Sequence, residues 1–554
     1  MISRPAHSIR RRAALASVGA LAVLTGMVLI PGSAQADTSS TVTVVGTSDV
    51  FDSDLIQQVI KPGFEAAYPQ YTLNYVSQGT GAAITYAEAG TASALLVHAA
   101  SLENQFVASG PPSFSYEQYG RAIFYGDYVL LGPAADPAGV MSGGQPSHDI
   151  VSAFQKIAAA GQDGTVNFVS RGGTPGTTVE EHGIWALTTG VTTCPVSTPN
   201  GGGSVPNADS NCGTPTLPSW YHTTGLTQGP NVVAADACNF TGGNCYALTD
   251  RGTFQFLEQE GALSNLRVVD NDNAASAPGG ANLLINSFHA YAINPAAFSS
   301  NPNVHINLPG ALAFLDWLTS PAGQNAVNSY QASDPGGPSF HKDAAPQITM
   351  RSTLPATVKS GQKLIVTGSL TNVVPGTPPL AGVEMTLSAK PNGGSSSSVA
   401  TTTTDANGNF TLHFTPTADA SYTVSSPAIS QIENSSLSPV YGDLLQPTSV
   451  PIGKSTVTGA PTISSVKAHT GTVTIKGTLS PTVSGSGAKL VVYAGHASAA
   501  GLHVVSTVAL TNGAKTFTVK VKLRRGITWK VRVKYVNTGT ITAGTSAASS
   551  VHVT

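Results

Sequence analysis

Two polar segments of the chain combine hydroxyl, glycine and arginine residues in the way that oxyanion sites require. The first is Gly46-Thr47-Ser48, which follows a β-branched run and precedes a helical pattern of apolar residues. The second is the segment 170–177, Ser-Arg-Gly-Gly-Thr-Pro-Gly-Thr, which follows a strand pattern ending at Val169. At such junctions the first helical turn presents free N–H groups, and Arg171 adds a forked positive charge. We predict two anion-binding loops; for either loop alone, an ordinary Ser/Thr helix cap is the alternative.

Carboxylates close to the first loop bear on the choice of anion. Asp49, Asp52 and Asp54 follow Ser48 directly. Tungstate, molybdate and sulfate need hydrogen-bond donors only, whereas monohydrogen phosphate benefits from one carboxylate acceptor. These aspartates also suit a simpler role, complementing the positive end of a helix. The residues therefore predict a tetrahedral oxyanion and leave its identity open.

Catalytic patterns are weak, and we expect no enzyme and no cofactor. Glu180, Glu181 and His182 are adjacent, and neighbours on a helix point in different directions. The sequence has no G-x-S-x-G and no H-E-x-x-H motif. Ser464 and Lys467 have S-x-x-K spacing, but in a strand-rich segment that does not place both side chains on one face.

Alternating strand and helix patterns predict the architecture. Strands and helices alternate from residue 41 to about 169, and a further strand to Ile293 and a helix from Pro309 return the chain to the first sheet. Two α/β lobes joined by crossing strands result. After Pro346, short β-branched runs separated by Gly, Pro, Asn and Ser predict two all-β sandwiches that resemble secreted bacterial immunoglobulin-like modules.

Six motifs occur in order within residues 41–332, namely 45–54, 79–81, 94–98, 168–172 with 176–177, 248–253 and 314–321. Together they resemble the extracellular tungstate-binding proteins of ABC importers, a branch of the type II periplasmic-binding-protein fold. The resemblance implies that Thr47 and Ser48 donate to the oxyanion from the first lobe, and Arg171 and Thr177 from the second. Arg251 would either add a ligand or brace Asp250 and the hinge.

The resemblance also implies a function and partners. We expect tungstate first and molybdate next, delivered to an ABC permease; a phosphate-binding protein of the same fold is the alternative. A wall-associated adhesion or scaffold protein with a residual binding fold is the second alternative. The chain departs from the family's usual pattern at Gly46, Ala99, Gly173 and Pro175, where hydroxyl or acidic residues are usual.

The N-terminus and the cysteines indicate export. A basic stretch, an apolar run from Ala13 to Ile30 and Ala34-Gln35-Ala36 predict a signal peptide over residues 1–36, without a lipid-anchoring cysteine; an uncleaved anchor is the alternative. We therefore expect a secreted, cell-surface-associated protein. Because exported cysteines oxidise, we predict disulfides Cys194–Cys212 and Cys238–Cys245 by proximity, with zinc binding as the alternative.

Charge divides the chain into unlike parts. Residues 37–350 hold 24 acidic and seven basic residues, and residues 351–554 hold 16 basic and five acidic ones. We place the domains at 37–348 (oxyanion binding), 349–452 (immunoglobulin-like) and 455–554 (basic sandwich). This last part has 11 basic and no acidic residues, and alternation over 519–534 predicts Lys520, Lys522, Lys530, Arg532 and Lys534 on one exposed face. Such a face would bind anionic cell-wall polymers; we expect no nucleic-acid partner.

Overall fold

The computed structural model describes residues 39–554 except 111, 197–202, 435–440, 484–485, 498–500 and 537–540. The predicted signal peptide, residues 1–36, lies outside the described residues. Among those described, no helix is both long enough and apolar enough to cross a bilayer.

The first lobe is a mixed parallel and antiparallel sheet with helices against it. Its strands lie in the order β2-β1-β3-β11-β4, where β1, β2 and β3 are parallel and β11 runs antiparallel to β3 and β4. Val42, Val44 and Phe314 are fully buried in its core. The strands are β1 Thr41–Thr47, β2 Thr72–Gln78, β3 Ala94–Val97, β4 Gly120–Pro133 and β11 Ile285–Ala292. The helices are α1 Ser48–Asp52, η1 Ile56–Ile60, α2 Lys61–Ala67, α3 Thr80–Glu88, α4 Ala100–Ala108, η2 Pro295–Phe298, α9 Leu308–Thr319 and α10 Pro321–Asn328.

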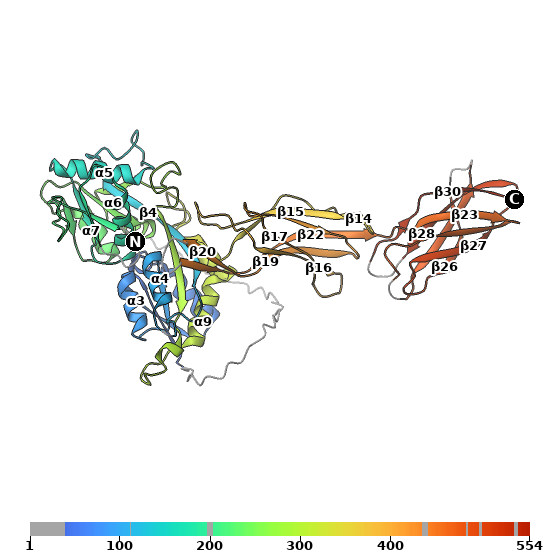
Figure 1. The fold of residues 1–554 in the computed structure, drawn as a ribbon, viewed down its shortest axis with the longest axis horizontal. Coiled ribbons are helices and arrows are strands. Elements are labelled where there is room, and N and C mark those ends of the chain that lie inside the picture. The colour runs from blue at the N-terminus through green and yellow to red at the C-terminus, as the bar shows by residue number, and fades with distance from the viewer. Residues whose placement is uncertain are drawn as a thin grey trace, which may run out of the picture. The chain divides into compact units, whose positions relative to one another are not determined.

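The second lobe repeats this arrangement with fewer strands. Its order is β4-β9-β5-β8, with β5 parallel to both neighbours and β10 added to β4. Phe154, Phe168 and Trp185 are buried in its core, and Figure 1 shows α5, α6 and α7 in this lobe. The strands are β5 Asn167–Ser170, β8 Tyr221–Thr223, β9 Cys245–Asp250 and β10 Leu266–Asp270, with a separate pair β6 Thr193–Val196 and β7 Gly203–Pro206. The helices are α5 Ile150–Gln162, α6 Gly176–Leu187, α7 Gln228–Ala237 and α8 Arg251–Gln259.

One long strand joins the lobes, as the sequence predicted. Residues 121–127 of β4 pair with β11 in the first lobe, and residues 128–131 pair with β9 in the second. The short strand β12 (His341–Lys342) also pairs with β4, at Phe124 and Tyr125. Because β4 passes through both sheets, its middle is the position at which a hinge between the two lobes is expected.

Both predicted disulfides are confirmed. Cys194 bonds to Cys212 and Cys238 bonds to Cys245. The zinc alternative is wrong, because all four sulfur atoms are used in disulfides and no free cysteine remains.

After residue 346 the described chain is built of strands. A three-stranded sheet, β13-β15-β18, and a five-stranded sheet, β14-β22-β19-β16-β17, bury alternate residues such as Leu412 and Val424 in a common core. Their bounds are β13 Gln347–Met350, β15 Leu364–Thr371, β18 Asn409–Phe414, β14 Thr357–Lys359, β22 Thr448–Thr458, β19 Ala420–Ser426, β16 Glu384–Pro391 and β17 Ser397–Thr403. This unit begins with β13 and ends with β22, so it extends beyond the 349–452 segment that we assigned. A hairpin, β20 (Ile429–Asn434) and β21 (Tyr441–Leu445), pairs through β21 with β4.

The C-terminal strands form a second pair of sheets (Figure 1). One sheet is β23-β24-β27, with bounds Thr462–His469, Thr472–Thr478 and Thr516–Lys522. The other is β26-β25-β28-β29 with β30 beside β28; the bounds are β26 His503–Ala509, β25 Lys489–His496, β28 Ile527–Val536, β29 Gly544–Thr545 and β30 Ser549–Val553. The immunoglobulin-like class of both units stays a prediction.

The prediction of a single basic face is wrong. Lys520 and Lys522 are exposed on β27, and Lys530 and Arg532 are exposed on β28, so the alternation itself is as predicted. However, β27 belongs to the three-stranded sheet and β28 to the other one. In two sheets that share a core the outward side chains point in opposite directions, so these cations lie on two faces.

Candidate oxyanion-binding site

The candidate site lies where strands end in both lobes. β1 ends at Thr47, β5 at Ser170 and β9 at Asp250. β1 is parallel to β2 and β3, and β5 is parallel to β9. In open α/β sheets, ligands bind beyond the carboxyl ends of parallel strands, because the following loops and helix starts present unpaired N–H groups there.

The first predicted loop is buried. Thr47 is 2% exposed and Ser48 is fully buried, with α1 beginning at Ser48. A Cβ at Gly46 would lie 2.3 Å from the Tyr75 hydroxyl and 2.6 Å from the Leu96 carbonyl oxygen. The Tyr75 hydroxyl donates to the Thr47 carbonyl oxygen at 2.8 Å. Tyr75 thus occupies the space of a side chain at position 46, which explains the absence of a third hydroxyl residue in this loop.

The second loop carries Arg171 into contact with the first. Arg171 is only 6% exposed. Its Nη2 donates to the Ser48 hydroxyl at 3.0 Å, and its Nε donates to the Leu226 carbonyl oxygen at 3.3 Å. Burial lowers the pKa of Arg171, and the nearby charges of Asp49 and Asp52 oppose that shift. A guanidinium from the second lobe and a hydroxyl from the first therefore meet where both are buried.

Gln228, the first residue of α7, holds the second-lobe donors together. Its side-chain oxygen accepts from Arg171 Nη1 at 2.8 Å and from the Thr177 hydroxyl at 2.9 Å. Its side-chain nitrogen donates to the Thr249 hydroxyl at 2.6 Å. Because Gln228 is fully buried and all three bonds are made to buried side chains, it fixes the positions of Arg171 and Thr177 relative to each other.

A first-lobe carboxylate contacts the start of the same helix. The Asp52 carboxylate accepts from the Gly229 backbone N–H of α7 at 2.8 Å. This is a capping contact made across the cleft, since a carboxylate is stabilised by the N–H groups and positive end of a helix. Asp52 therefore joins the two lobes on one side of Arg171.

Asp49 forms a buried ion pair beside the first loop. His98 Nε2 lies 2.8 Å from the Asp49 carboxylate, and His98 Nδ1 lies 2.9 Å from the Tyr128 hydroxyl. Burial alone would raise the pKa of Asp49, but His98 outweighs it and the pKa falls to about 2. A charged carboxylate is therefore present next to Thr47 and Ser48 throughout the physiological pH range.

Asp250 is a second buried acid at the strand ends, and its pKa is shifted in the opposite direction to that of Asp49. It caps α8 by accepting from the Thr253 backbone N–H at 2.8 Å. Burial, followed by the charge of Asp49, raises the pKa of Asp250 to about 7. The two acids thus titrate in separate ranges because only Asp49 has a histidine partner in direct contact.

The structure does not bring Arg251 to the predicted ligands, and it does not brace Asp250. Its Nε donates to both carboxylate oxygens of Asp127 on β4, at 2.8 and 3.0 Å, and its Nη2 contacts the same carboxylate. A further oxygen, of Asp272, lies 4.0 Å away. Arg251 therefore ties the start of α8 to the strand that joins the lobes.

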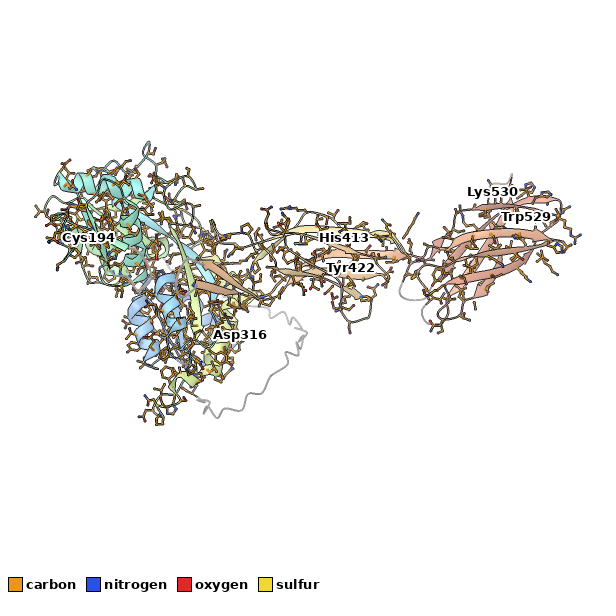
Figure 2. All side chains as sticks on the ribbon, viewed as in Figure 1. Cys194, Asp316, His413, Tyr422, Trp529 and Lys530 are labelled. Carbon is orange, nitrogen blue, oxygen red and sulfur yellow. A yellow bond between two sulfur atoms is a disulfide. The ribbon has the colours of Figure 1, made fainter. Side chains whose placement is uncertain are left out.

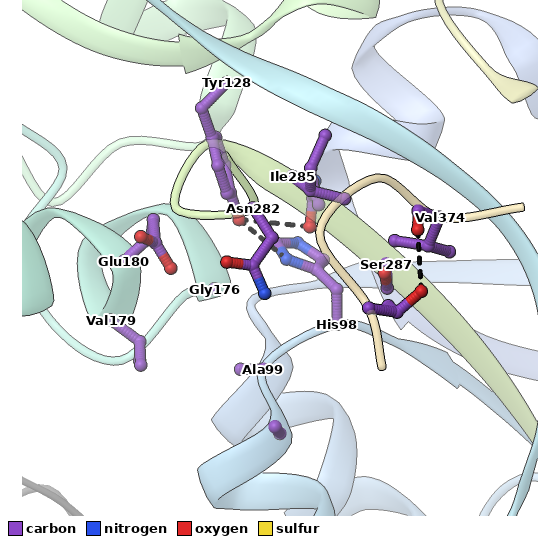
Figure 3. A pocket seen from close by; sticks show the side chains of 13 residues that line it. His98, Ala99, Tyr128, Gly176, Val179, Glu180, Asn282, Ile285, Ser287 and Val374 are labelled. Atoms are coloured by element: carbon purple, nitrogen blue, oxygen red, sulfur yellow. Dashed lines mark hydrogen bonds between the residues drawn. The ribbon is translucent and has the colours of Figure 1, made fainter. Parts of the chain in front are cut away.

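A cavity of about 290 Å³ lies beside His98 and the start of α6 (Figure 3). Its polar lining includes His98, Tyr128, Glu180 and Asn286. A Cβ at Gly176 would lie 2.1 Å from His98 Cε1, so only glycine allows the start of α6 to approach the first lobe this closely. Figure 3 shows His98 and Tyr128 joined by their hydrogen bond, between α6 and the crossing strands.

Four of the five predicted ligands come together, and two unpredicted residues join them. Ser48 accepts from Arg171, Thr47 precedes Ser48 in the same loop, and Gln228 connects Arg171 to Thr177. Sequence reasoning missed Gln228 altogether. It considered Asp52 as a possible acceptor for a protonated anion or as a helix-end charge, but did not foresee its contact with α7. Gln228 carries a weak signal, a polar residue at the start of a helix, which is too common to single it out.

Comparison with known proteins identifies the family of the two lobes. Residues 31–322 match the family model described as PBP superfamily domain. A Haloferax volcanii protein named for anion binding with an ABC transporter is 32% identical over 52% of this chain and 69% of its own. The tungstate-binding protein TupA of Peptoclostridium acidaminophilum is 28% identical over 49% of this chain and 75% of its own.

Among solved structures, the tungstate-binding protein TupA of Desulfovibrio alaskensis G20 is 26% identical, covering 55% of this chain and 98% of its own with a TM-score of 0.38. The two-lobed fold and the donors converging between the lobes define a binding protein of the periplasmic type. The chain belongs to the PBP superfamily. The matched residues end before β13, so the family assignment concerns the two lobes and not the sheets that follow.

Proposed function

We propose that this protein captures a tetrahedral oxyanion outside the cell for an ABC importer, with tungstate the first candidate and molybdate the next. Thr47, Ser48, Arg171 and Thr177 donate to the anion, and Gln228 positions the last two. Lobe closure about β4 encloses the ligand, and the closed form is the one that the permease binds. The named relatives support the ligand class and the importer.

The observation that carries this proposal is the contact between Arg171 and Ser48. Their 3.0 Å hydrogen bond places donors from both lobes within one anion's reach, and both residues are buried. A charge-assisted hydrogen bond is strongest where water is excluded. An anion that replaces Ser48 as the acceptor for Arg171 and also accepts from the hydroxyls would hold the lobes together.

Calorimetry with tungstate, molybdate, sulfate and phosphate tests the proposal on the wild-type chain. We expect tungstate and molybdate to bind and small-angle scattering to show contraction of the lobes with the bound anion. A wild-type protein that binds none of the four anions contradicts the proposal. Arg267→Ala serves as a matched control for Arg171 variants, because Arg267 is an exposed arginine of the same lobe.

Phosphate is the second candidate, favoured by the position of Asp49. This ionised carboxylate lies beside Thr47 and Ser48 and can accept a hydrogen bond from the hydroxyl group of monohydrogen phosphate. For tungstate the same charge is repulsive. If phosphate is the ligand, Asp49→Asn weakens phosphate binding and leaves or improves tungstate binding; the reverse order of effects favours tungstate.

A further inference from the structure

We propose that the three-stranded sheet of the C-terminal sandwich binds a linear polymer of repeating phosphate groups at the cell surface. The proposal is independent of the anion site and rests on residues 455–554. This segment holds 11 lysine and arginine residues and no aspartate or glutamate. A surface with no carboxylate cannot pair its cations internally, so these cations attract anions from solution, and a polyanion can contact several of them at once.

The outward side of the sheet β23-β24-β27, here called the lysine face, has its cations in register. Lys467 on β23 is aligned with Thr474 on β24, which is aligned with Lys520 on β27. The next row along the strands is His469, Thr472 and Lys522. Residues two apart on a strand are separated by about 7 Å and next-nearest strands by about 10 Å, so the lysines form a regular grid.

The groups between the lysines are also hydrogen-bond donors. Thr472 and Thr474 occupy the central strand of both rows, and their flanking lysines are exposed. Hydroxyls and ammonium groups together suit phosphate oxygens, which only accept. The inward residues Val473, Ile475 and Val519 are buried, which holds the strands flat beneath the face.

The opposite face of the sandwich has a similar charge, but its cations are interspersed with apolar side chains. On β28 the exposed cations Lys530 and Arg532 neighbour apolar groups: Tyr493 of β25 is aligned with both Arg532 and Val504, and Val504 is 56% exposed. Figure 2 labels Lys530 and Trp529, successive residues of this strand. Cations interrupted by apolar side chains suit a polyphosphate chain less well than an uninterrupted grid of donors.

The composition of the lysine face selects among polyanions. Its two rows contain no large apolar side chain that could enter a bilayer, which surface-bound membrane proteins use in addition to charge. They also contain no Phe, Tyr or Trp for stacking on bases, the usual contact with single-stranded nucleic acids. A polyol phosphate offers only repeated charge and hydroxyl groups, which is what the face is built to contact.

The full-length chain and two matched variants test this assignment against purified poly(glycerol phosphate). One variant changes Lys467, Lys520 and Lys522 to Gln, and the other changes Lys530, Arg532 and Lys534 to Gln. Each removes three positive charges, so a pure net-charge effect weakens both equally. We expect a roughly 100-fold loss of affinity for the first and less than about fivefold for the second, since a basic residue at an anionic surface contributes about a factor of five.

Further measurements distinguish the proposed interaction from misfolding of the variants and from binding to other polyanions. Changing Lys467, Lys520 and Lys522 to Arg keeps the charge and should keep binding, and thermal unfolding shows whether each variant is folded. Binding should weaken steeply with added salt. Equal losses in the two Gln variants, no binding by the wild type, or tighter binding to mixed anionic phospholipid vesicles or single-stranded DNA would each overturn the proposal.

Discussion

Replacing Gln228 by Glu tests whether this residue controls the charge of the anion site. In the wild type the neutral side-chain oxygen accepts from Arg171 at 2.8 Å and from Thr177 at 2.9 Å. Glutamate has nearly the same shape and can accept both bonds, so the positions of Arg171 and Thr177 should not change. The new charge, however, pairs with Arg171 and opposes an incoming anion.

The size of the effect follows from Coulomb's law. An anion held by Arg171 would lie about 6 Å from the new carboxylate, and at an effective dielectric constant of about 20 two unit charges at that distance repel by about 3 kcal/mol. This corresponds to a loss of affinity of roughly 100-fold for a singly charged anion, and to a larger loss for a dianion such as tungstate. Gln228→Met removes the hydrogen bonds to Arg171, Thr177 and Thr249 without adding a charge. It acts on the anion only through the positions of Arg171 and Thr177, so it should cost less, about tenfold.

Calorimetry with the anion that the wild type binds measures both losses. Asn231→Asp is the matched control: Asn231 lies on the same helix, is fully buried, and accepts a hydrogen bond from Thr224 instead of from Arg171. It introduces the same charge change away from the site and should alter affinity little. Equal affinities for Gln228→Glu and Gln228→Met, or an equal loss in the Asn231 variant, would refute the reasoning.

Three other predictions concern single residues. Arg171→Ala should lower anion affinity about ten- to a hundredfold by calorimetry, because it removes a buried charge-assisted donor; an unchanged affinity would remove Arg171 from the site. Burial raises the pKa of Glu181 from 4.5 to about 7, against hydrogen bonds that lower it. The folded pKa lies above the unfolded one, so the unfolded chain loses its proton first and stability falls as pH rises between these values, by about 3 kcal/mol. Glu181→Gln should therefore raise the melting temperature at pH 8 and leave it unchanged near pH 4; equal shifts at both would contradict this sign. The Cys238–Cys245 bond closes a loop with a sequence separation of 7, so its loss in Cys238→Ser should cost about 2 to 3 kcal/mol in chemical denaturation, and a non-reduced digest should show the bonded peptides.

Much of the fold could be predicted because its signals are local. Short β-branched runs indicated the strands after Pro346, and the polar segments after β1 and β5 indicated the two loops that meet at Arg171. The disulfides followed from short separations within one exported segment. In each case the residues that determine the structure are neighbours in the sequence.

The missed parts of the site depend on contacts between distant residues. Gln228 lies 57 residues from its partner Arg171, and only the pairing of β5 with β8 and β9 brings α7 back to that loop. Arg251 was linked to Asp250 because the two are adjacent. Adjacent residues at a helix start point in different directions, however, and the long guanidinium reaches Asp127 on β4, 124 residues away.

The C-terminal basic sandwich, residues 455–554, shows why alternation along a strand does not by itself define a surface. Alternation states which side chains leave the core, but not which sheet the strand joins. Only residues 523–526 separate β27 from β28, a length typical of a hairpin, yet β27 pairs with β24 and β28 with β25. Leu523 is buried within this connection, so the chain crosses the core edge there and changes sheet. The crossing divides the cations into an uninterrupted lysine face and a face mixed with Tyr493 and Val504. The two faces have similar charge but different composition. Variants of each face can therefore distinguish an effect of net charge from an effect of one particular binding surface.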